Sequence, residues 1–170
     1  MKKIILSAIA VMAFGFANAQ EQTKEGKWLI EANTGFGAGV GTTSFGLSTN
    51  DDITQWNIGA EAGYFVIDNL AVKLGLGYGD TGAEGASSSF AYKIGAKYYI
   101  VNKFPVEVSF NGVNYEDWDD NPSFVGLQGG YAWFLGPNVS VEPGLRYNVS
   151  LDDKIADNYL QFNIGFALHF

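Results

Sequence analysis

The sequence predicts an all-β protein: an eight-stranded antiparallel up-and-down transmembrane β-barrel. Three observations lead to this fold class. Side chains alternate between apolar and small or polar with a period of two almost everywhere after Gln20. The connections alternate between long loops and tight turns, and aromatic residues gather at strand ends on the apolar face. Together these features are typical of a meander whose two ends face different compartments.

The N-terminus predicts a secretory signal peptide. Two lysines precede an apolar or small run from Ile4 to Phe16, and a small-x-small cleavage site ends at Ala19. A retained anchor helix is the alternative, but the run is short for a membrane span. We therefore expect three segments, namely a cleaved signal peptide at 1–19, a short polar lead-in at 20–26 and the barrel domain at 27–170.

Composition excludes several classes of protein. The chain has 10 basic and 18 acidic side chains, and removal of the two signal-peptide lysines leaves 8 against 18, a net charge of −10. Such an acidic chain is not expected to bind nucleic acid. It has no cysteine, so we expect neither disulfides nor a lipoprotein anchor. Later segments lack a continuous apolar run of helical spanning length, so any membrane crossing must use strands.

The first four strands are separated by a long loop, a tight turn and a second long loop. The loop at 38–54 is rich in Gly, Ser, Thr and Asp, Asp68 and Asn69 form a turn, and the second loop covers 80–88. On each strand the large apolar residues share one face, as Val72, Leu74 and Leu76 do. These four strands are expected at 27–37, 55–65, 70–79 and 89–100.

The last four strands follow the same rhythm. A turn lies near Asn102, an acidic loop covers 113–123, a turn covers 136–138, and a final loop covers 150–157. Each strand has about the length that crosses a bilayer when tilted, so we expect the tight turns at the periplasmic end and the long loops outside. These strands are expected at 104–112, 124–134, 139–149 and 159–170.

The strand charges lie opposite the apolar face, which places them inside the barrel. That face is also crowded with glycine, as a narrow interior requires. Its four carboxylates match its four cations, as a low-dielectric interior demands. We expect Glu61 to pair with Lys73, Lys97 to face Glu107, and the two charges on 139–149 each to pair across the lumen. The network, either a structural plug or a charged gate, comprises Glu31, Glu61, Lys73, Lys93, Lys97, Glu107, Glu142 and Arg146.

The apolar face ends in aromatic residues on both sides of an aliphatic belt. Two aromatic girdles around such a belt are typical of a surface that faces lipid. A soluble barrel would instead turn its apolar face inward and its charges outward. The expected girdle residues are Trp28, Trp56, Tyr64, Tyr78, Tyr98, Trp133, Tyr147 and Phe170.

Two stretches resemble the small outer-membrane β-barrel family, the OmpA/OmpX-like transmembrane domain. They are "GAEAGYFVIDNLAVKLGLGYG" at 59–79 and the terminal "FNIGFALHF" at 162–170. The resemblance covers essentially all of the chain after the signal peptide. It implies a bacterial outer-membrane location, surrounding outer-membrane lipid, and recognition of the strand ending in Phe170 by the barrel assembly machinery. The sequence ends with the barrel, so we do not expect the cell-wall tethering of a full-length OmpA.

Catalysis is not expected. His169, the single histidine, falls on the inward face at the turn end of the last strand, and no G-x-S-x-G motif appears. Acidic clusters at 50–52, 116–121 and 151–153 with Asp157 could bind divalent cations or an extracellular partner, although they lack the spacing of an EF-hand. Solvated loops are the favoured interpretation.

The sequence therefore favours a non-enzymatic outer-membrane protein without a cofactor. We expect it to contribute to envelope structure or to surface interaction through its extracellular loops. The alternative is a narrow gated channel for passive transport of ions or small solutes, since an eight-stranded barrel leaves little free bore.

Overall fold

The computed structural model describes residues 21–35, 43–50, 53–80, 82, 88–116 and 119–170. The expected signal peptide lies outside the described residues, and so do Asp51, Asp52, Asp117 and Trp118 of the acidic loops. In the described ranges, no helix has the length and apolar composition needed to cross a bilayer.

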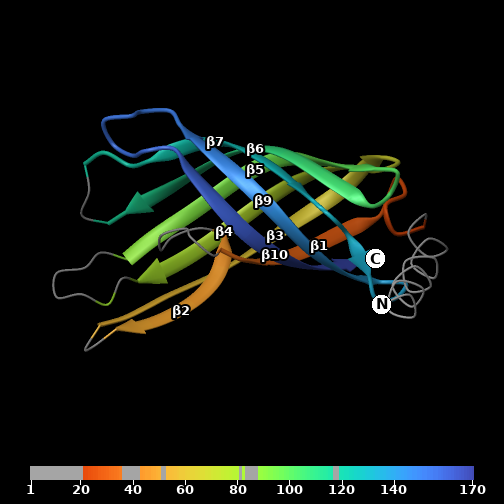
Figure 1. Ribbon diagram of the computed structural model, residues 1–170, viewed down its shortest axis with the longest axis horizontal. Helices are drawn as coiled ribbons and strands as arrows, with labels where there is room; N and C mark the ends of the chain where they lie inside the picture. The colour runs from red at the N-terminus through yellow and green to blue at the C-terminus, as the bar shows by residue number, and fades with distance from the viewer. Residues whose placement is uncertain (1–20, 36–42, 51–52, 81, 83–87, 117–118) are drawn as a thin grey trace, which may run out of the picture.

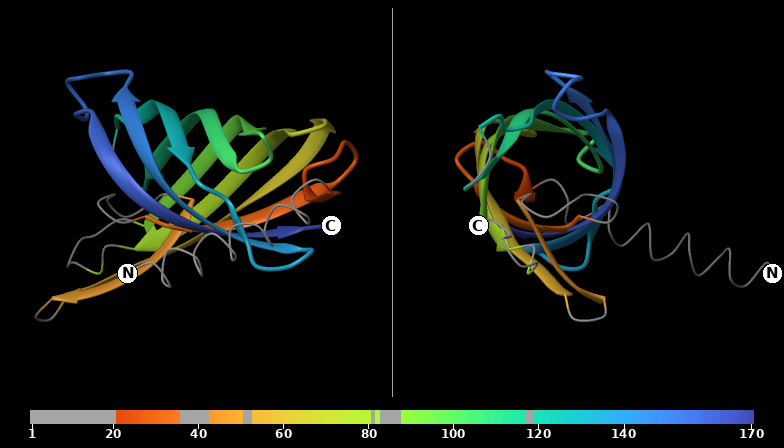
Figure 2. Two further views of the ribbon diagram at one scale, coloured as in Figure 1. Left: turned by 45° about the vertical axis from the view of Figure 1, so that its right-hand side comes forward. Right: turned by 90° about the vertical axis from the view of Figure 1, so that its left-hand side faces the viewer.

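The described residues form a closed β-barrel (Figures 1 and 2). Nine strands follow one another round the ring in the order β10–β1–β2–β3–β4–β5–β6–β7–β9, and β9 pairs with β10 to close it. A tenth strand, β8, pairs with β9 outside this order. The strands are β1 (Trp28–Thr34), β2 (Ser44–Asn50), β3 (Ile53–Ile67), β4 (Leu70–Asp80), β5 (Ser88–Ile100), β6 (Phe104–Tyr115), β7 (Ser123–Gly130), β8 (Trp133–Phe134), β9 (Val139–Ser150) and β10 (Tyr159–His169).

The closed all-β barrel is confirmed, but the expected count of eight strands in a wholly antiparallel ring is not. The stretch 38–54, expected to be a loop, contains β2 and the start of β3. Five residues of β2 pair antiparallel with β3, and its first two pair in parallel with β1. At the end of the barrel that carries the tight turns (the turn end), β1 pairs directly with β3. Strand β2 therefore lies between them only at the opposite end, which carries the long loops (the loop end). Its Gly, Ser, Thr and Asn composition is typical of loops, and only the backbone pairing reveals a strand.

The stretch expected as one strand at 124–134 is divided into β7 and β8. The pairing between β6 and β7 ends at Gly129, and the N–H of Ala132 then donates to the carbonyl of Lys103 over 2.7 Å. The inward and outward alternation continues across the break, because Ala132 and Phe134 are buried and Trp133 is exposed. The periodicity therefore predicted the direction of the side chains correctly but could not show where the ladder ends.

The two faces of the wall differ as expected. Outward aliphatic side chains such as Ile58, Leu74 and Leu127 are exposed, whereas the strand charges are buried inside. At the turn end the interior becomes apolar, with a cluster that the sequence reasoning did not describe. The cluster consists of Leu29, Phe65, Ala71, Tyr99, Ala132, Phe134 and Ala167.

The segment 21–27 packs against the turn end of the barrel, although residues 20–26 were expected to be only a polar lead-in. Gln22 and Thr23 are buried there. Thr23 Oγ1 donates to Asn69 Oδ1 over 2.6 Å, and Asn102 Nδ2 donates to both residues, at 3.2 Å to Thr23 and 2.9 Å to Asn69. Gln22 Nε2 donates to the carbonyl of Gly136 over 2.8 Å. One short segment therefore joins the β3–β4 turn, the β5–β6 turn and the connection after β8.

Candidate functional site

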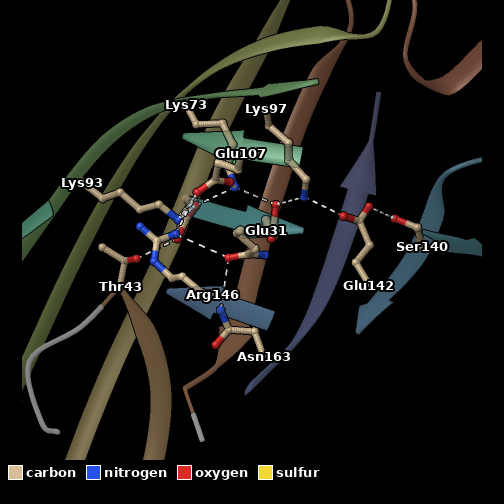
Figure 3. A network of polar contacts seen from close by, with 12 residues as sticks. Glu31, Thr43, Lys73, Lys93, Lys97, Glu107, Ser140, Glu142, Arg146 and Asn163 are labelled. Atoms are coloured by element: carbon tan, nitrogen blue, oxygen red, sulfur yellow. Dashed lines mark hydrogen bonds and ion pairs between the residues drawn. The ribbon is translucent and has the colours of Figure 1, made fainter. Parts of the chain in front are cut away.

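The candidate site is the charged network inside the barrel, which Figure 3 shows from close by. Period-two alternation points each of its side chains inward, and at most 5% of each residue is exposed. Six strands contribute: Glu31 from β1, Glu61 from β3, Lys73 from β4, Lys93 and Lys97 from β5, Glu107 from β6, and Glu142 and Arg146 from β9.

Lys73 is the centre of the network. Its Nζ lies 2.8 Å from Glu31, 2.6 Å from Glu61 and 2.8 Å from Glu107. Three carboxylates on three different strands therefore surround the ammonium: Glu31 and Glu107 accept hydrogen bonds from it, and Glu61 forms an ion pair with it. Glu31 and Glu61 stand directly opposite each other in the β1–β3 ladder. Lys73 therefore neutralises a pair of like charges that would otherwise repel.

The network extends from this centre toward both ends of the barrel. On the turn side, Lys97 Nζ lies 2.7 Å from Glu31 and 2.5 Å from Glu142. On the loop side, Lys93 Nζ lies 2.8 Å from Glu61 and 2.6 Å from Glu107. Every carboxylate of the network therefore contacts at least one buried cation, and four of each sign leave it with no net charge.

Arg146 ends the network on the loop side. A guanidinium has five N–H donors, and the contacts of Nε, Nη1 and Nη2 account for five acceptors, so it keeps no spare donor for a solute anion. These acceptors are Asn148 at 2.9 Å, Glu107 at 3.0 Å, Gln128 at 3.4 Å, Asn111 at 2.9 Å and Ser109.

The pairs expected from sequence agree with the contacts in part. The structure contains the Glu61–Lys73 pair. Lys97 and Glu107 are cross-strand neighbours as expected, but the Lys97 ammonium reaches Glu31 and Glu142 instead. Glu142 and Arg146, which share β9, each pair with residues of other strands, as expected.

A small polar cavity of about 40 Å³ adjoins the network on its loop side. Asn33, Glu61, Lys93, Arg146 and Asn163 are among the residues that line it. A cavity of this size holds about one or two water molecules. It is too small for an organic solute.

His169 lies on the turn side of the network, with at most 1% of its surface exposed. Its Nε2 lies 3.0 Å from Ser140 Oγ, which also donates to Glu142 Oε1 over 2.8 Å. The ring lies among the aromatic residues Phe65, Tyr99 and Phe134. Sequence reasoning missed the contact with Ser140, which joins β9 to the end of β10. In a catalytic triad the carboxylate orients the histidine, whereas Glu142 here contacts the serine.

The expected girdle residues all point outward, and all are exposed. Trp28 packs against Tyr64 at the turn end with ring centroids 5.1 Å apart, and Trp56 packs against Tyr78 at the loop end at 6.0 Å. Phe170 continues the ladder beyond β10 by exchanging two backbone hydrogen bonds with Trp28. The last residue is thus paired with the first strand where the ring closes.

The described carboxylates of the acidic loops are exposed. Within the described part of the chain, no three His, Cys, Asp or Glu side chains are arranged to hold a metal ion. These exposed loop carboxylates are Glu116, Asp119, Asp120, Asp152, Asp153 and Asp157.

Solved structures with a similar fold include several outer-membrane barrels. The N-terminal β-barrel domain of Pseudomonas aeruginosa OprF aligns with a TM-score of 0.53 and 16% identity, covering 86% of this chain and 98% of that one. OprG from Pseudomonas aeruginosa aligns at 0.50 and 13%, covering 86% and 97%. Yersinia pestis Ail aligns at 0.50 and 11%, covering 86% and 100%.

No protein-family model matches the chain, and no curated protein matches it. At these identities the structural likeness concerns the fold alone. The chain has the fold of the small outer-membrane β-barrels, as the resemblance of its sequence predicted.

Proposed function

We propose that this protein is an integral protein of the bacterial outer membrane, without enzymatic activity, whose barrel is closed to solutes. It contributes to envelope structure or to interactions at the cell surface through its loop end. In this proposal the segment 1–19 directs export and is cleaved, outer-membrane lipid surrounds the belt, and the barrel assembly machinery recognises the strand that ends in Phe170.

The observation that carries the proposal is the filled lumen. Eight buried charged side chains meet across the middle of the barrel, Lys73 contacts three carboxylates, and all five donors of Arg146 are engaged. An ion crossing this layer would have to separate buried ion pairs, each of which costs several kcal/mol to break. The apolar cluster and the segment 21–27 add a second barrier at the turn end.

The loop end supplies the surface for an interaction. The hairpin of β2 and β3 extends beyond the rest of the ring (Figures 1 and 2) and exposes Phe45 and Leu47. Exposed acidic side chains also lie in the described parts of the loops after β6 and β9. A contact surface of this kind does not require an open lumen.

Ion conductance in a planar bilayer tests the proposal against the gated-channel alternative. We expect the folded protein, identified by its heat-dependent gel mobility, to leave the bilayer silent. The variant Lys73→Gln/Arg146→Gln, measured beside it, shows whether the network is the barrier. A steady wild-type conductance whose ion selectivity changes in this variant would overturn the closed-barrel proposal and make the network a gate.

A further inference from the structure

The outer wall carries a groove of about 440 Å³ across β4 to β7. Its sides are formed by Leu70, Tyr98 and Leu127, and Val106 and Val108 lie between them. Apart from Glu107 and Gln128, all the residues that line it are apolar side chains, tyrosine or glycine. The Glu107 side chain is buried in the lumen network, so only its backbone faces the groove. The groove is therefore a feature of the outer surface rather than an opening into the lumen.

The cross-strand register explains the hollow. One row across the wall runs Tyr98–Val106–Gly129, and the next runs Ala96–Val108–Leu127. Each row has a small residue at one end, Gly129 in the first and Ala96 in the second. Gly129 and Ala96 therefore lie at diagonally opposite corners of the two rows, with the two valines between them. A Cβ added at Gly129 would meet no atom within 4 Å, which shows that the space above it is open.

The groove lies in the turn-side half of the wall. Leu70 is the first residue of β4, and Tyr98 lies two residues before the end of β5. Tyr98 belongs to the turn-side aromatic girdle, and such girdles lie where membrane headgroups meet water. The groove thus begins at the girdle and leads into the aliphatic belt.

We propose that this groove holds one acyl chain of a phospholipid from the turn-side leaflet. The inference rests on the proposed membrane location, because the groove is continuous with the belt that lipid chains would cover. A cleft of several hundred Å³ with an apolar lining suits a flexible hydrocarbon chain. The bound acyl chain covers apolar surface of Ala96, Val108 and Leu127, which straight neighbouring lipids would leave poorly packed. The Tyr98 hydroxyl donates to the phosphate or ester oxygens of the same lipid.

Native mass spectrometry tests the inference on protein made from the full sequence and extracted from membranes. After removal of copurified lipid, phosphatidylethanolamine with palmitoyl and oleoyl chains is titrated back. The variant Ala96→Leu/Gly129→Leu fills the groove with two side chains. The matched control, Ala60→Leu/Ala62→Leu, adds nearly the same bulk to exposed positions of β3 outside the groove. We expect one retained lipid in wild type and control, and roughly tenfold weaker retention in the groove variant, because the lost contacts equal about two buried methylene groups.

Equal retention in all three proteins, or none in the wild type, would overturn the groove inference while leaving the proposed function intact. A dimer that dissociates only in the groove variant would assign the groove to a second copy of the chain and likewise overturn it. Failure of the wild type to insert into phospholipid vesicles would contradict the proposed function itself. Heat-dependent gel mobility confirms that each variant has folded before its lipid is measured.

Discussion

At the scale of single residues, Lys73 decides how the interior is held together. Its ammonium group bridges three carboxylates, two of which stand directly opposite each other on β1 and β3. With at most 1% of the residue exposed, water cannot replace these contacts. Removing one partner from a buried ionic network is far more costly than removing a surface pair.

We predict that Lys73→Gln lowers the free energy of unfolding by about 3–5 kcal/mol, because Glu31 and Glu61 lose the cation between them. Urea titration of protein folded into phospholipid vesicles, followed by tryptophan fluorescence, measures this change. Lys24→Gln is the control: Lys24 is exposed, lies 3.8 Å from Glu21, and should change stability by less than about 1 kcal/mol. The double variant Lys73→Gln/Glu61→Gln completes the test. If its loss of unfolding free energy equals the sum of the losses in Lys73→Gln and Glu61→Gln, the network is not coupled.

Gly95 shows why the inward face needs small residues. A Cβ added there would lie 2.7 Å from Ser109 Cβ and 2.7 Å from the carbonyl oxygen of Val108. These atoms belong to the paired strand β6 and cannot move without bending the ladder. The close approach of β5 and β6 therefore excludes any larger side chain.

We expect Gly95→Ala to destabilise the barrel by about 1–3 kcal/mol through this overpacking. Gly129→Ala adds the same methyl group where no atom lies within 4 Å, and its effect should stay within about 0.5 kcal/mol. The same urea titration compares both variants. Equal stabilities would show that β5 and β6 relax easily at Gly95.

At the scale of elements, the segment 21–27 is a structural part of the barrel rather than only a lead-in to it. Thr23 accepts and donates hydrogen bonds that join Asn69 and Asn102, two turn residues with positive φ. The carbonyl of Thr23 also accepts the N–H of Asn69 over 2.6 Å. These contacts hold the β3–β4 and β5–β6 turns together beneath the apolar cluster.

Thr23→Val keeps the shape of the side chain and removes its hydroxyl group. We predict a loss of about 1–3 kcal/mol, because the amide groups of Asn69 and Asn102 lose a buried partner. Amide hydrogen exchange should also become faster at the two turns. Thr54→Val, on the exposed part of β3, removes a hydroxyl that contacts only Thr49 in the described structure and should be nearly neutral. Unchanged exchange at the turns in Thr23→Val would show that the segment does not hold them.

At the scale of the whole molecule, the barrel is inverted relative to a soluble one. Its charges lie inside, and its aliphatic side chains lie outside between two aromatic girdles. The outer surface therefore requires an apolar solvent, and the cost of a surface charge should depend on its depth in the bilayer.

Leu74→Lys tests this dependence in the middle of the belt, where the leucine is 61% exposed. We predict a loss of about 2–4 kcal/mol in a bilayer, the cost of a lysine near the midplane. Leu151→Lys changes a leucine of similar exposure, 55%, in the loop after β9 and should cost less than about 0.5 kcal/mol. Unfolding in vesicles measures both. Equal costs would contradict a membrane-spanning belt.

Much of this architecture could be predicted from alternation alone. Strand side chains point to opposite faces in turn, so the burial of Glu31, Lys73 and Arg146 followed from their positions relative to Trp28, Val72 and Tyr147. Strand β2 could not be predicted in this way, because its turn-forming composition hides a ladder that only its partners reveal. The Ser140–His169 contact could not be predicted either, because it joins residues 29 positions apart in the sequence.

The sequence by itself determined which side chains face the lumen and which face outward, because that choice depends only on the local period of the strand. It also determined that the strands place four negative and four positive charges in the interior. Only the tertiary structure decided which ammonium reaches which carboxylate, how the segment 21–27 closes the turn end, and where the groove lies on the wall. These features depend on register and ring closure, which bring together residues that are far apart along the chain.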